Sequence, residues 1–273
     1  MKKHGTTILL IVIFTLGLCL LLYPTVSDWW NSSRQSKAIT SYSETVENMQ
    51  QSEYSAIIAK AHEFNEIIKK KGVFQYLSDE EMKKYTETLD ITGTGIMGYI
   101  EIPSINVSLP IYHTVEEDVL QVAVGHIEWT SLPVGGESTH CVLSGHRGLP
   151  SAKLFTNLDK LVEGDIFTIT VLNETLTYQV DQVLIVEPED TDDLYVIEGE
   201  DLCTLITCTP YGINSHRLLV RGHRIENIEE ESPLHVTSEA FRIDPLLVAP
   251  VVAAPILLAL LVYVLIKYKR KKK

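Results

Sequence analysis

An apolar run lies near each end of the chain, and together the two runs decide where the rest can fold. Residues 8–23 follow Lys2 and Lys3, and residues 246–266 carry no charge and precede a basic tail at 267–273. A spanning helix needs about 20 apolar residues, and basic flanks favour the cytoplasmic side. We therefore expect a two-span protein of the cell membrane, with both termini cytoplasmic and the intervening chain extracellular.

The first run has a second interpretation, a cleavable signal peptide. Signal peptides have a shorter apolar core and a small-residue cleavage site, and residues 24–30 contain no clear Ala-x-Ala pattern. This favours an uncleaved membrane anchor over residues 1–24. The length of the second run and its basic tail favour a spanning helix there over a buried core helix.

The exterior part of the chain is strongly acidic. Of 23 basic and 36 acidic residues, eight basic and no acidic ones lie in the two tails, which leaves a net charge of −21 between the spans. Proteins that bind nucleic acids neutralise phosphates with basic side chains, so we expect no nucleic-acid partner. A basic partner is compatible with this charge, although a solvated acidic surface is the simpler explanation.

Between the spans, the pattern changes from helical to β near residue 95. Apolar residues recur at spacings of mostly three and four through residues 33–71, and Gly72 would end that helix. We expect an exterior helical segment over residues 33–90, with a domain boundary at 91–95.

A mainly β domain is expected over residues 96–228. Residues 172–174 predict a hairpin turn, and short helical patches are expected near 118–124 and 151–159. The expected strands are rich in β-branched and aromatic residues and bounded by Pro, Gly, Asn or Asp; they cover 96–102, 107–113, 140–146, 165–171, 175–186, 203–208 and 216–224. Seven or eight short strands indicate one closed barrel or sandwich.

Three of these strands place reactive side chains at their ends. Thr204–Cys208 delivers a cysteine, the strand before Gly148 delivers His146, and Arg217 follows nine residues after Cys208. If the first two strands are parallel neighbours, alternation places His146 and Cys208 on one face. A nearby cation stabilises a thiolate, and a guanidinium stabilises developing negative charge. The set predicts an acyl-transfer site.

The other three cysteines are not expected to be reactive. Cys19 lies in the first apolar run, which leaves Cys141, Cys203 and Cys208 outside. Three cysteines are too few for a disulfide scaffold, and an odd number cannot all pair with one another. The register that joins His146 to Cys208 also places Cys141 beside Cys203 on the opposite face. Side-by-side positions in parallel strands suit a disulfide poorly, so we interpret this pair as core thiols.

Several alternatives stay open on the residues alone. Arg221 shares a strand face with Arg217, which is favoured only because it lies nearer Cys208. A metal site of Cys208 with His140 and His146 is a rival, but the sequence has no Cys-x-x-Cys or His-Glu-x-x-His spacing. The eight acidic residues between positions 187 and 201 lack the EF-hand pattern. We predict a solvated loop there, with no metal and no cofactor.

Five segments and one signature resemble a known family. Thr204–Cys208 with Arg217 resembles the Thr-Leu-x-Thr-Cys…Arg signature of sortases, the cysteine transpeptidases of Gram-positive surfaces. A resemblance to the class C, pilus-assembling branch is carried by Gly95–Pro103, Gly125–His126, Thr130–Gly136, His146–Pro150 and Thr209–Arg224.

The resemblance implies a closed eight-stranded β-barrel and a set of roles. Cys208 would be the nucleophile, His146 the general acid and base, and Arg217, rather than Arg221, the clamp on the oxyanion or the substrate. Cys208 would attack the Thr–Gly bond of a Leu-Pro-x-Thr-Gly-like sorting signal. A lysine amine of the next pilin would then resolve the thioacyl enzyme as an isopeptide. Pilins or surface proteins with such signals are the implied partners, and no cofactor is implied.

One departure from the class C pattern concerns the lid. Members of that class usually carry an Asp-Pro-aromatic motif that plugs the active site, and the lid region here, residues 72–95, contains no Asp-Pro. Ser78 and Glu81 instead have the spacing of a capping box, which predicts a short helix over about 79–88. We therefore expect any lid to be helical or to lack the usual anchor.

Two other functions are compatible with the sequence. A housekeeping-type sortase, which anchors surface proteins to the cell wall, would use the same chemistry; the C-terminal apolar run and the class C segments favour pilus assembly. A non-catalytic surface-assembly module on the same barrel is the alternative from another class. An intact Cys208, His146 and Arg217 weigh against that alternative.

Overall fold

The computed structural model describes residues 5–72, 74–227, 255, 258 and 262. The chain forms two compact units, one made of residues 1–30 and 230–273 and the other of residues 31–229. The expected span at 246–266 lies outside the described residues apart from three positions, and the basic tail lies wholly outside them. Both stay predictions.

The chain begins with one long helix, α1 (Gly5–Glu47), which includes Pro24. Within the described residues, Ile8–Glu47 is the one helix long and apolar enough to cross a membrane, with a mean hydropathy of 2.5 over its most apolar stretch. This finding supports a membrane anchor near the N-terminus. The expected separate helix start at residue 33 is wrong, because the helix continues without a break from the apolar run.

The expected single helix over 33–71 is also interrupted. It breaks at residues 48–50, and a new helix, α2 (Gln51–Lys71), begins there. The reason is a capping box: the Gln50 backbone N–H donates to the Glu53 carboxylate at 2.8 Å. Because Gln50 has an extended backbone, it caps a new helix rather than continuing the old one.

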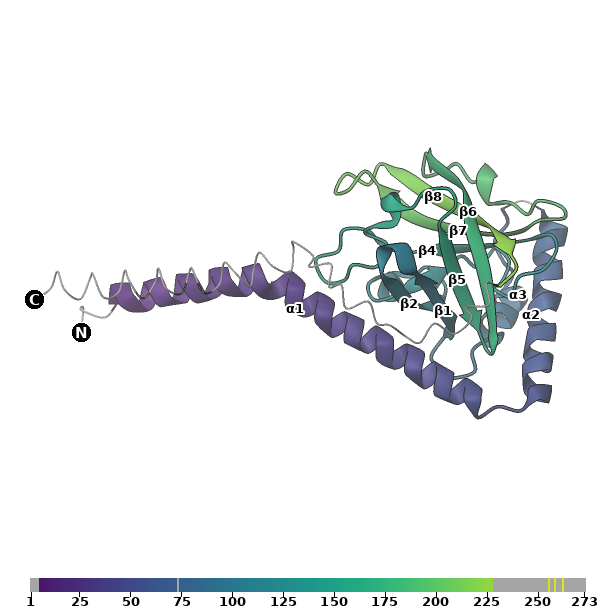
Figure 1. Ribbon diagram of the computed structural model, residues 1–273, viewed down its shortest axis with the longest axis horizontal. Helices are drawn as coiled ribbons and strands as arrows, with labels where there is room; N and C mark the ends of the chain where they lie inside the picture. Colours follow the sequence, from purple (N-terminus) through teal and green to yellow (C-terminus); the bar gives the residue numbers. More distant parts are fainter. Residues whose placement is uncertain (1–4, 73, 228–254, 256–257, 259–261, 263–273) are drawn as a thin grey trace, which may run out of the picture. The chain divides into compact units, whose positions relative to one another are not determined.

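Eight strands close into a barrel, as expected (Figure 1). The strands are β1 (Ile96–Ile102), β2 (Val107–His113), β3 (Val124–His126), β4 (Thr139–Ser144), β5 (Ile166–Val171), β6 (Glu174–Val186), β7 (Asp201–Thr209) and β8 (His216–Ile225). Around the barrel their order is β1, β2, β3, β4, β7, β8, β6, β5. The pairs β2–β3 and β4–β7 are parallel, and the other neighbours are antiparallel.

The helical patch expected near 118–124 is wrong beyond its first turn. The helix α4 (Glu117–Leu120) has only four residues. The chain then enters β3, where Val124 pairs with Ile111 of β2. Pairing with a neighbouring strand therefore overrides the local helical pattern, as tertiary context often does.

The patch expected near 151–159 is also wrong. Its single regular element is the 3₁₀ turn η2 (Leu158–Lys160). Leu154 and Phe155 are both buried in the core of the barrel, so their burial decides the path of this loop.

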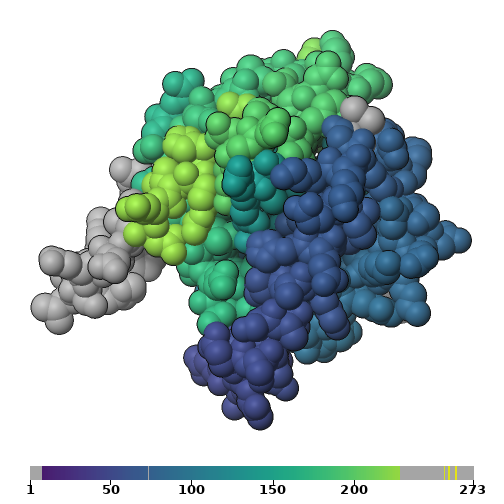
Figure 2. Space-filling model, turned by 90° about the vertical axis from the view of Figure 1, so that its right-hand side faces the viewer, coloured from purple at the N-terminus to yellow at the C-terminus, as the bar shows by residue number. Residues whose placement is uncertain are grey.

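The helices α2 and α3 (Asp79–Glu87) pack against one side of the barrel, and Figure 2 shows them as a blue layer beside the green strands. Their contact centres on aromatic rings, with the centroids of Phe64 and Tyr85 5.7 Å apart. The buried Tyr85 hydroxyl donates to the His126 carbonyl at 3.1 Å and accepts from the Thr114 amide at 3.0 Å. The helical layer is thereby fixed to the strands that lead into the site.

Candidate active site

The strands β4, β7 and β8 carry two distinct apolar faces. Leu143, Leu205 and Val220 point into the barrel and belong to its main core. The residues that alternate with them, Val142, Ile206 and Leu219, lie on the outside. Together with Leu194 they form a second, smaller group, which we call the outer cluster; Ile127, Trp129, Leu184 and Val186 pack against it. Alternation along the strands therefore places Cys208 and Arg217 on the outer face.

Cys208 and Arg217 lie directly opposite each other. They are paired in the antiparallel register of β7 and β8, and facing residues have Cβ atoms about 5 Å apart. Both side chains are half-buried. The Arg217 guanidinium donates to the carbonyls of His216 at 3.1 Å and Asn214 at 3.4 Å. These bonds hold the guanidinium at the start of β8, on the strand that pairs with the strand of the thiol.

The pairing of β4 and β7 is parallel, which was the condition for the sequence argument, and it brings His146 to the same end of the barrel. Ser144 pairs with Ile206. The pairing then extends beyond β4, since the Gly145 amide donates to the Ile206 carbonyl at 3.1 Å and the Thr207 hydroxyl donates to the Gly145 carbonyl at 2.8 Å. The residue before His146 is thus tied to the residue before the thiol.

The backbone of His146 is held from its other side by Phe155. The Phe155 amide donates to the His146 carbonyl at 3.1 Å. A Cβ atom added to Gly145 would lie 2.7 Å from the Phe155 ring, a distance that real contacts do not reach. Only glycine therefore lets the ring lie against the chain just before the histidine.

Sequence reasoning missed Glu117. Its carboxylate Oε2 lies 3.8 Å from His146 Nε2, and its Oε1 accepts a hydrogen bond from Gln121 one turn along α4. The His146 side chain is 28% exposed and that of Glu117 is 73% exposed. Nothing in the local sequence indicates this approach, because it depends on where the loop from β2 to β3 crosses the end of β4.

Arg147 was also missed, although it directly follows His146. Its side chain is only 9% exposed and pairs with Asp159. It also donates to the Thr209 hydroxyl at 3.4 Å and lies over the Tyr211 ring, 5.9 Å from the centroid. Its buried Nε has no hydrogen-bond partner within the described part of the chain. Arg147 therefore joins the loop after β4 to the loop after β7.

Arg221, the rival of Arg217, is engaged elsewhere. It forms a two-point ion pair with Asp181, with distances of 3.0 and 3.3 Å. In the β7–β8 register it faces Thr204, four residues before Cys208. Its guanidinium is thus both paired and remote from the strand ends.

His140, proposed as a metal ligand in the rival interpretation, is buried and hydrogen-bonded. Its Nδ1 donates to the Tyr195 carbonyl at 2.9 Å, so its Nε2 accepts from the Thr204 hydroxyl at 2.7 Å. Burial lowers the pKa of His140 to about 4, which keeps the ring neutral. Across residues 5–72 and 74–227, no three His, Cys, Asp or Glu side chains gather as metal ligands.

Cys141 and Cys203 lie side by side in the β4–β7 register, as the sequence predicted. Both are buried free thiols of the inner face. Burial raises the pKa of the Cys203 thiol well above its ordinary value. These two cysteines are therefore core residues, chemically unlike the half-exposed Cys208.

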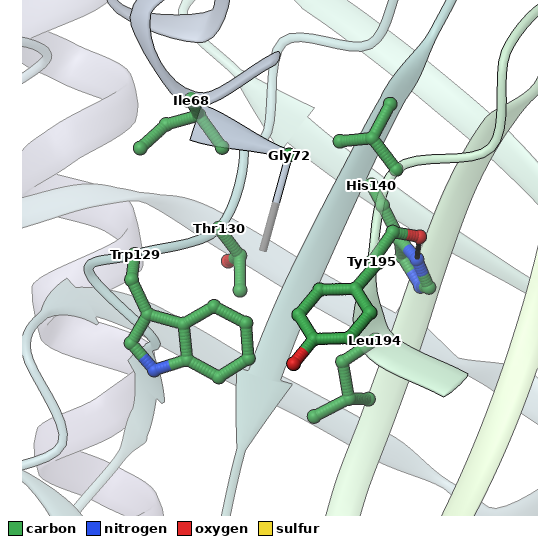
Figure 3. Close-up of a pocket in the computed structure, with 8 residues that line it drawn as sticks. Ile68, Gly72, Trp129, Thr130, His140, Leu194 and Tyr195 are labelled. Atoms are coloured by element: carbon green, nitrogen blue, oxygen red, sulfur yellow. Dashed lines mark hydrogen bonds between the residues drawn. The ribbon is translucent and has the colours of Figure 1, made fainter. Parts of the chain in front are cut away.

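At its end away from Cys208, the outer cluster borders a pocket lined by aromatic side chains, which we call the aromatic hollow. Figure 3 shows Trp129 and Tyr195 facing each other across it, with Thr130 and His140 behind. The two ring centroids are 6.4 Å apart. The hollow lies away from the thiol, next to the buried His140, so we assign it to the covered part of the outer face.

The lid region meets this hollow through one aromatic contact. Gly72 ends α2 in the left-handed conformation, with a φ of 69°. Ser78 and Glu81 form the predicted capping box, because the Ser78 amide donates to the Glu81 carboxylate at 2.7 Å. Between the helices, Phe74 lies edge-on to Trp129 with ring centroids 5.0 Å apart. This aromatic contact ties the segment to the outer cluster without an Asp-Pro motif.

A solved structure shows which family has this architecture. The chain is 52% identical to sortase C1 from Streptococcus agalactiae, covering 70% of this chain and 99% of that one, with a TM-score of 0.69. The chain belongs to the sortase family. The sequence pattern of the family described as "Sortase domain" matches residues 100–225 of this chain. Sortases are cysteine transpeptidases, so the thiol, imidazole and guanidinium at the strand ends are candidates for that chemistry.

Other relatives place the chain within the family. It is 44% identical to sortase C from Streptococcus pneumoniae, with a TM-score of 0.64, over 70% of this chain and 97% of that one. Sortase D from Bacillus subtilis is 30% identical over 131 residues, which cover 47% of this chain and 63% of that protein. The close structural matches are class C sortases. This sortase is therefore more similar to class C sortases than it is to the Bacillus subtilis protein.

Proposed function

We propose that this sortase joins pilin subunits through an acyl enzyme on Cys208. The observation that carries the proposal is the direct pairing of Cys208 with Arg217 on the outer face, where the Gly145 bonds bring His146. The high identity to class C sortases supports pilins as substrates. The structure of the S. pneumoniae relative is said to give insights into its catalysis and its pilin substrate specificity.

The first half of the reaction forms the acyl enzyme. The Cys208 thiolate attacks the Thr carbonyl of a Leu-Pro-x-Thr-Gly-like signal, and Arg217 stabilises the developing oxyanion. The His146 imidazolium donates a proton to the departing glycine amine as the C–N bond breaks. Val186, a half-buried residue packed against the outer cluster, pairs with Arg217 in the β6–β8 register and offers an apolar contact for the Leu-Pro part of the signal.

The second half transfers the acyl group. The neutral His146 accepts a proton from a lysine ammonium of the next pilin, the resulting amine attacks the thioacyl carbon, and the remaining nitrogen proton passes to water. The C–N bond forms, the C–S bond breaks, and Cys208 leaves as a thiolate. The product is an isopeptide between two subunits.

The expected membrane topology completes the proposal. The N-terminal apolar helix holds the enzyme at the membrane, and residues 33–228, between the two expected spans, act on the outside of the cell. Both termini then lie in the cytoplasm, provided that residues 246–266 cross the membrane.

The test uses the full-length protein in detergent micelles with a purified pilin that carries a Leu-Pro-x-Thr-Gly signal. We expect covalent pilin ladders on denaturing gels with the wild type and none with Cys208→Ala. Cleavage without ladders, together with transfer to a cell-wall precursor, would identify a housekeeping sortase instead. Absence of any cleavage by a folded wild type would favour a non-catalytic surface module.

A further inference from the structure

We propose that Glu117 binds the acceptor amine beside His146 and thereby selects a lysine over water as the second substrate. The inference rests on the proposed transfer to a lysine and adds a specificity-determining residue to it. It starts from the Glu117 carboxylate, whose Oε2 the structure places 3.8 Å from the imidazole Nε2 of His146.

One hydrogen bond orients this carboxylate. Glu117 lies at the start of α4, and Gln121 donates to its Oε1 from the next turn. The second oxygen, Oε2, is thereby left facing His146 Nε2. A side chain that is 73% exposed would otherwise sample several rotamers, so the Gln121 bond is what makes its position useful.

The distance between the two groups suits a third atom. A separation of 3.8 Å is too long for a hydrogen bond between Glu117 Oε2 and His146 Nε2. A nitrogen placed to one side of that line can lie about 2.8 to 3.0 Å from both atoms. An ammonium group meets both requirements, because it donates to the carboxylate and can pass a proton to the neutral imidazole.

The chemistry of the transfer step balances with the amine in this place. The lysine ammonium gives one proton to His146, which restores the imidazolium. The resulting amine attacks the thioacyl carbon, the C–N bond forms and the C–S bond to Cys208 breaks. The second nitrogen proton passes to water. Water itself carries no charge for Glu117 to attract, so the carboxylate favours the amine over hydrolysis.

The test measures how the acyl enzyme divides between two products. The full-length protein is given a Leu-Pro-x-Thr-Gly peptide and Nα-acetyl-lysine amide, and the ratio of transfer product to hydrolysis product is followed with amine concentration. We expect Glu117→Gln to lower this ratio roughly fivefold, a size that fits one exposed charged contact, and to raise the KM for the amine. Glu116→Gln removes the same charge from the adjacent exposed residue and should leave the ratio unchanged.

Hydroxylamine separates charge recognition from any other role. It is an uncharged nucleophile at neutral pH, so Glu117→Gln should leave its ratio to hydrolysis as in the wild type. An unchanged lysine ratio in Glu117→Gln would overturn the inference alone. Equal loss of transfer and hydrolysis would also overturn it, because Glu117 would then act through His146. A wild type that hydrolyses the peptide but never transfers it to amine would overturn the proposed function as well.

Discussion

The outer face of the barrel carries two similar sets of side chains, one covered and one open. The covered set is His140, Thr204 and Arg221. The open set is His146, Cys208 and Arg217. In the strand register Thr204 faces Arg221 just as Cys208 faces Arg217. The two sets therefore share a scaffold and differ in what surrounds them.

The surroundings decide what each set can do. In the covered set, His140 bonds to Tyr195 and Thr204, and Arg221 is paired with Asp181. Those groups are committed to structure. In the open set, the side chains are half-buried at the strand ends, where a peptide can reach them. Strand ends supply reactivity here because they are rigid on one side and open on the other.

The largest expected effect is on the open set. Cys208→Ala should lower cleavage of a Leu-Pro-x-Thr-Gly peptide by at least about a thousandfold, because it removes the nucleophile. The melting temperature should stay near that of the wild type. Thr204→Val, at the matching place in the covered set, should keep most of the activity. Equal activity losses in the two variants would break the comparison.

The two arginines give the next largest contrast. Arg217→Gln should lower kcat for peptide cleavage by about a hundredfold, since a group that stabilises the oxyanion is lost. Arg221→Gln should change kcat less than about threefold and lower stability instead, because Asp181 loses its two-point ion pair and keeps only the longer approach of His223. Steady-state kinetics and urea unfolding of both variants measure this. A larger loss of kcat in Arg221→Gln would reverse the assignment.

The low pKa of His140, the histidine of the covered set, predicts that the stability of the fold changes with pH. Its pKa of about 4 in the folded chain lies below the ordinary value of about 6.5. Between these values the unfolded chain binds more protons, so stability is present above pH 6.5 and is lost as the pH falls towards 4. The expected loss is about 3 kcal/mol. Urea unfolding across this range should show a flatter pH dependence for His140→Gln, whereas Thr204→Ser should keep the wild-type slope.

The smallest effect is expected in the lid region. Substitutions at residues 77–81, such as Ser78→Ala, should leave peptide cleavage nearly unchanged, because this stretch forms a helix cap rather than a plug. The lost cap should lower stability by about 1 kcal/mol. A large rise in cleavage rate would instead mean that this stretch inhibits the enzyme.

Much of the site follows from alternation along strands. Once β4 and β7 were assumed to be parallel neighbours, the equal spacing of Cys141 and Cys203 before His146 and Cys208 gave their register, which the structure has. The same rule could not choose between Arg217 and Arg221, since both lie on the outer face. Their difference depends on Asp181, which comes from another strand.

The missed parts depend on contacts between distant segments. Glu117 reaches His146 only because the loop from β2 to β3 crosses the end of β4. Similarly, Phe155 is buried under the loop after β4, where a short helix was expected. Local periodicity contains no information on such crossings. The continuation of α1 past Pro24 was missed for a local reason, because a proline usually ends or kinks a helix.

The most direct test of the account is to find where the acyl group resides. The full-length wild type is mixed with a Leu-Pro-x-Thr-Gly peptide, quenched with acid within seconds and mapped by mass spectrometry. We expect one thioester, on Cys208 at the open end of the outer face. This adduct should be lost on addition of an amine. An acyl group on Cys141 or Cys203, or cleavage with no adduct on Cys208 under any quench, would contradict it.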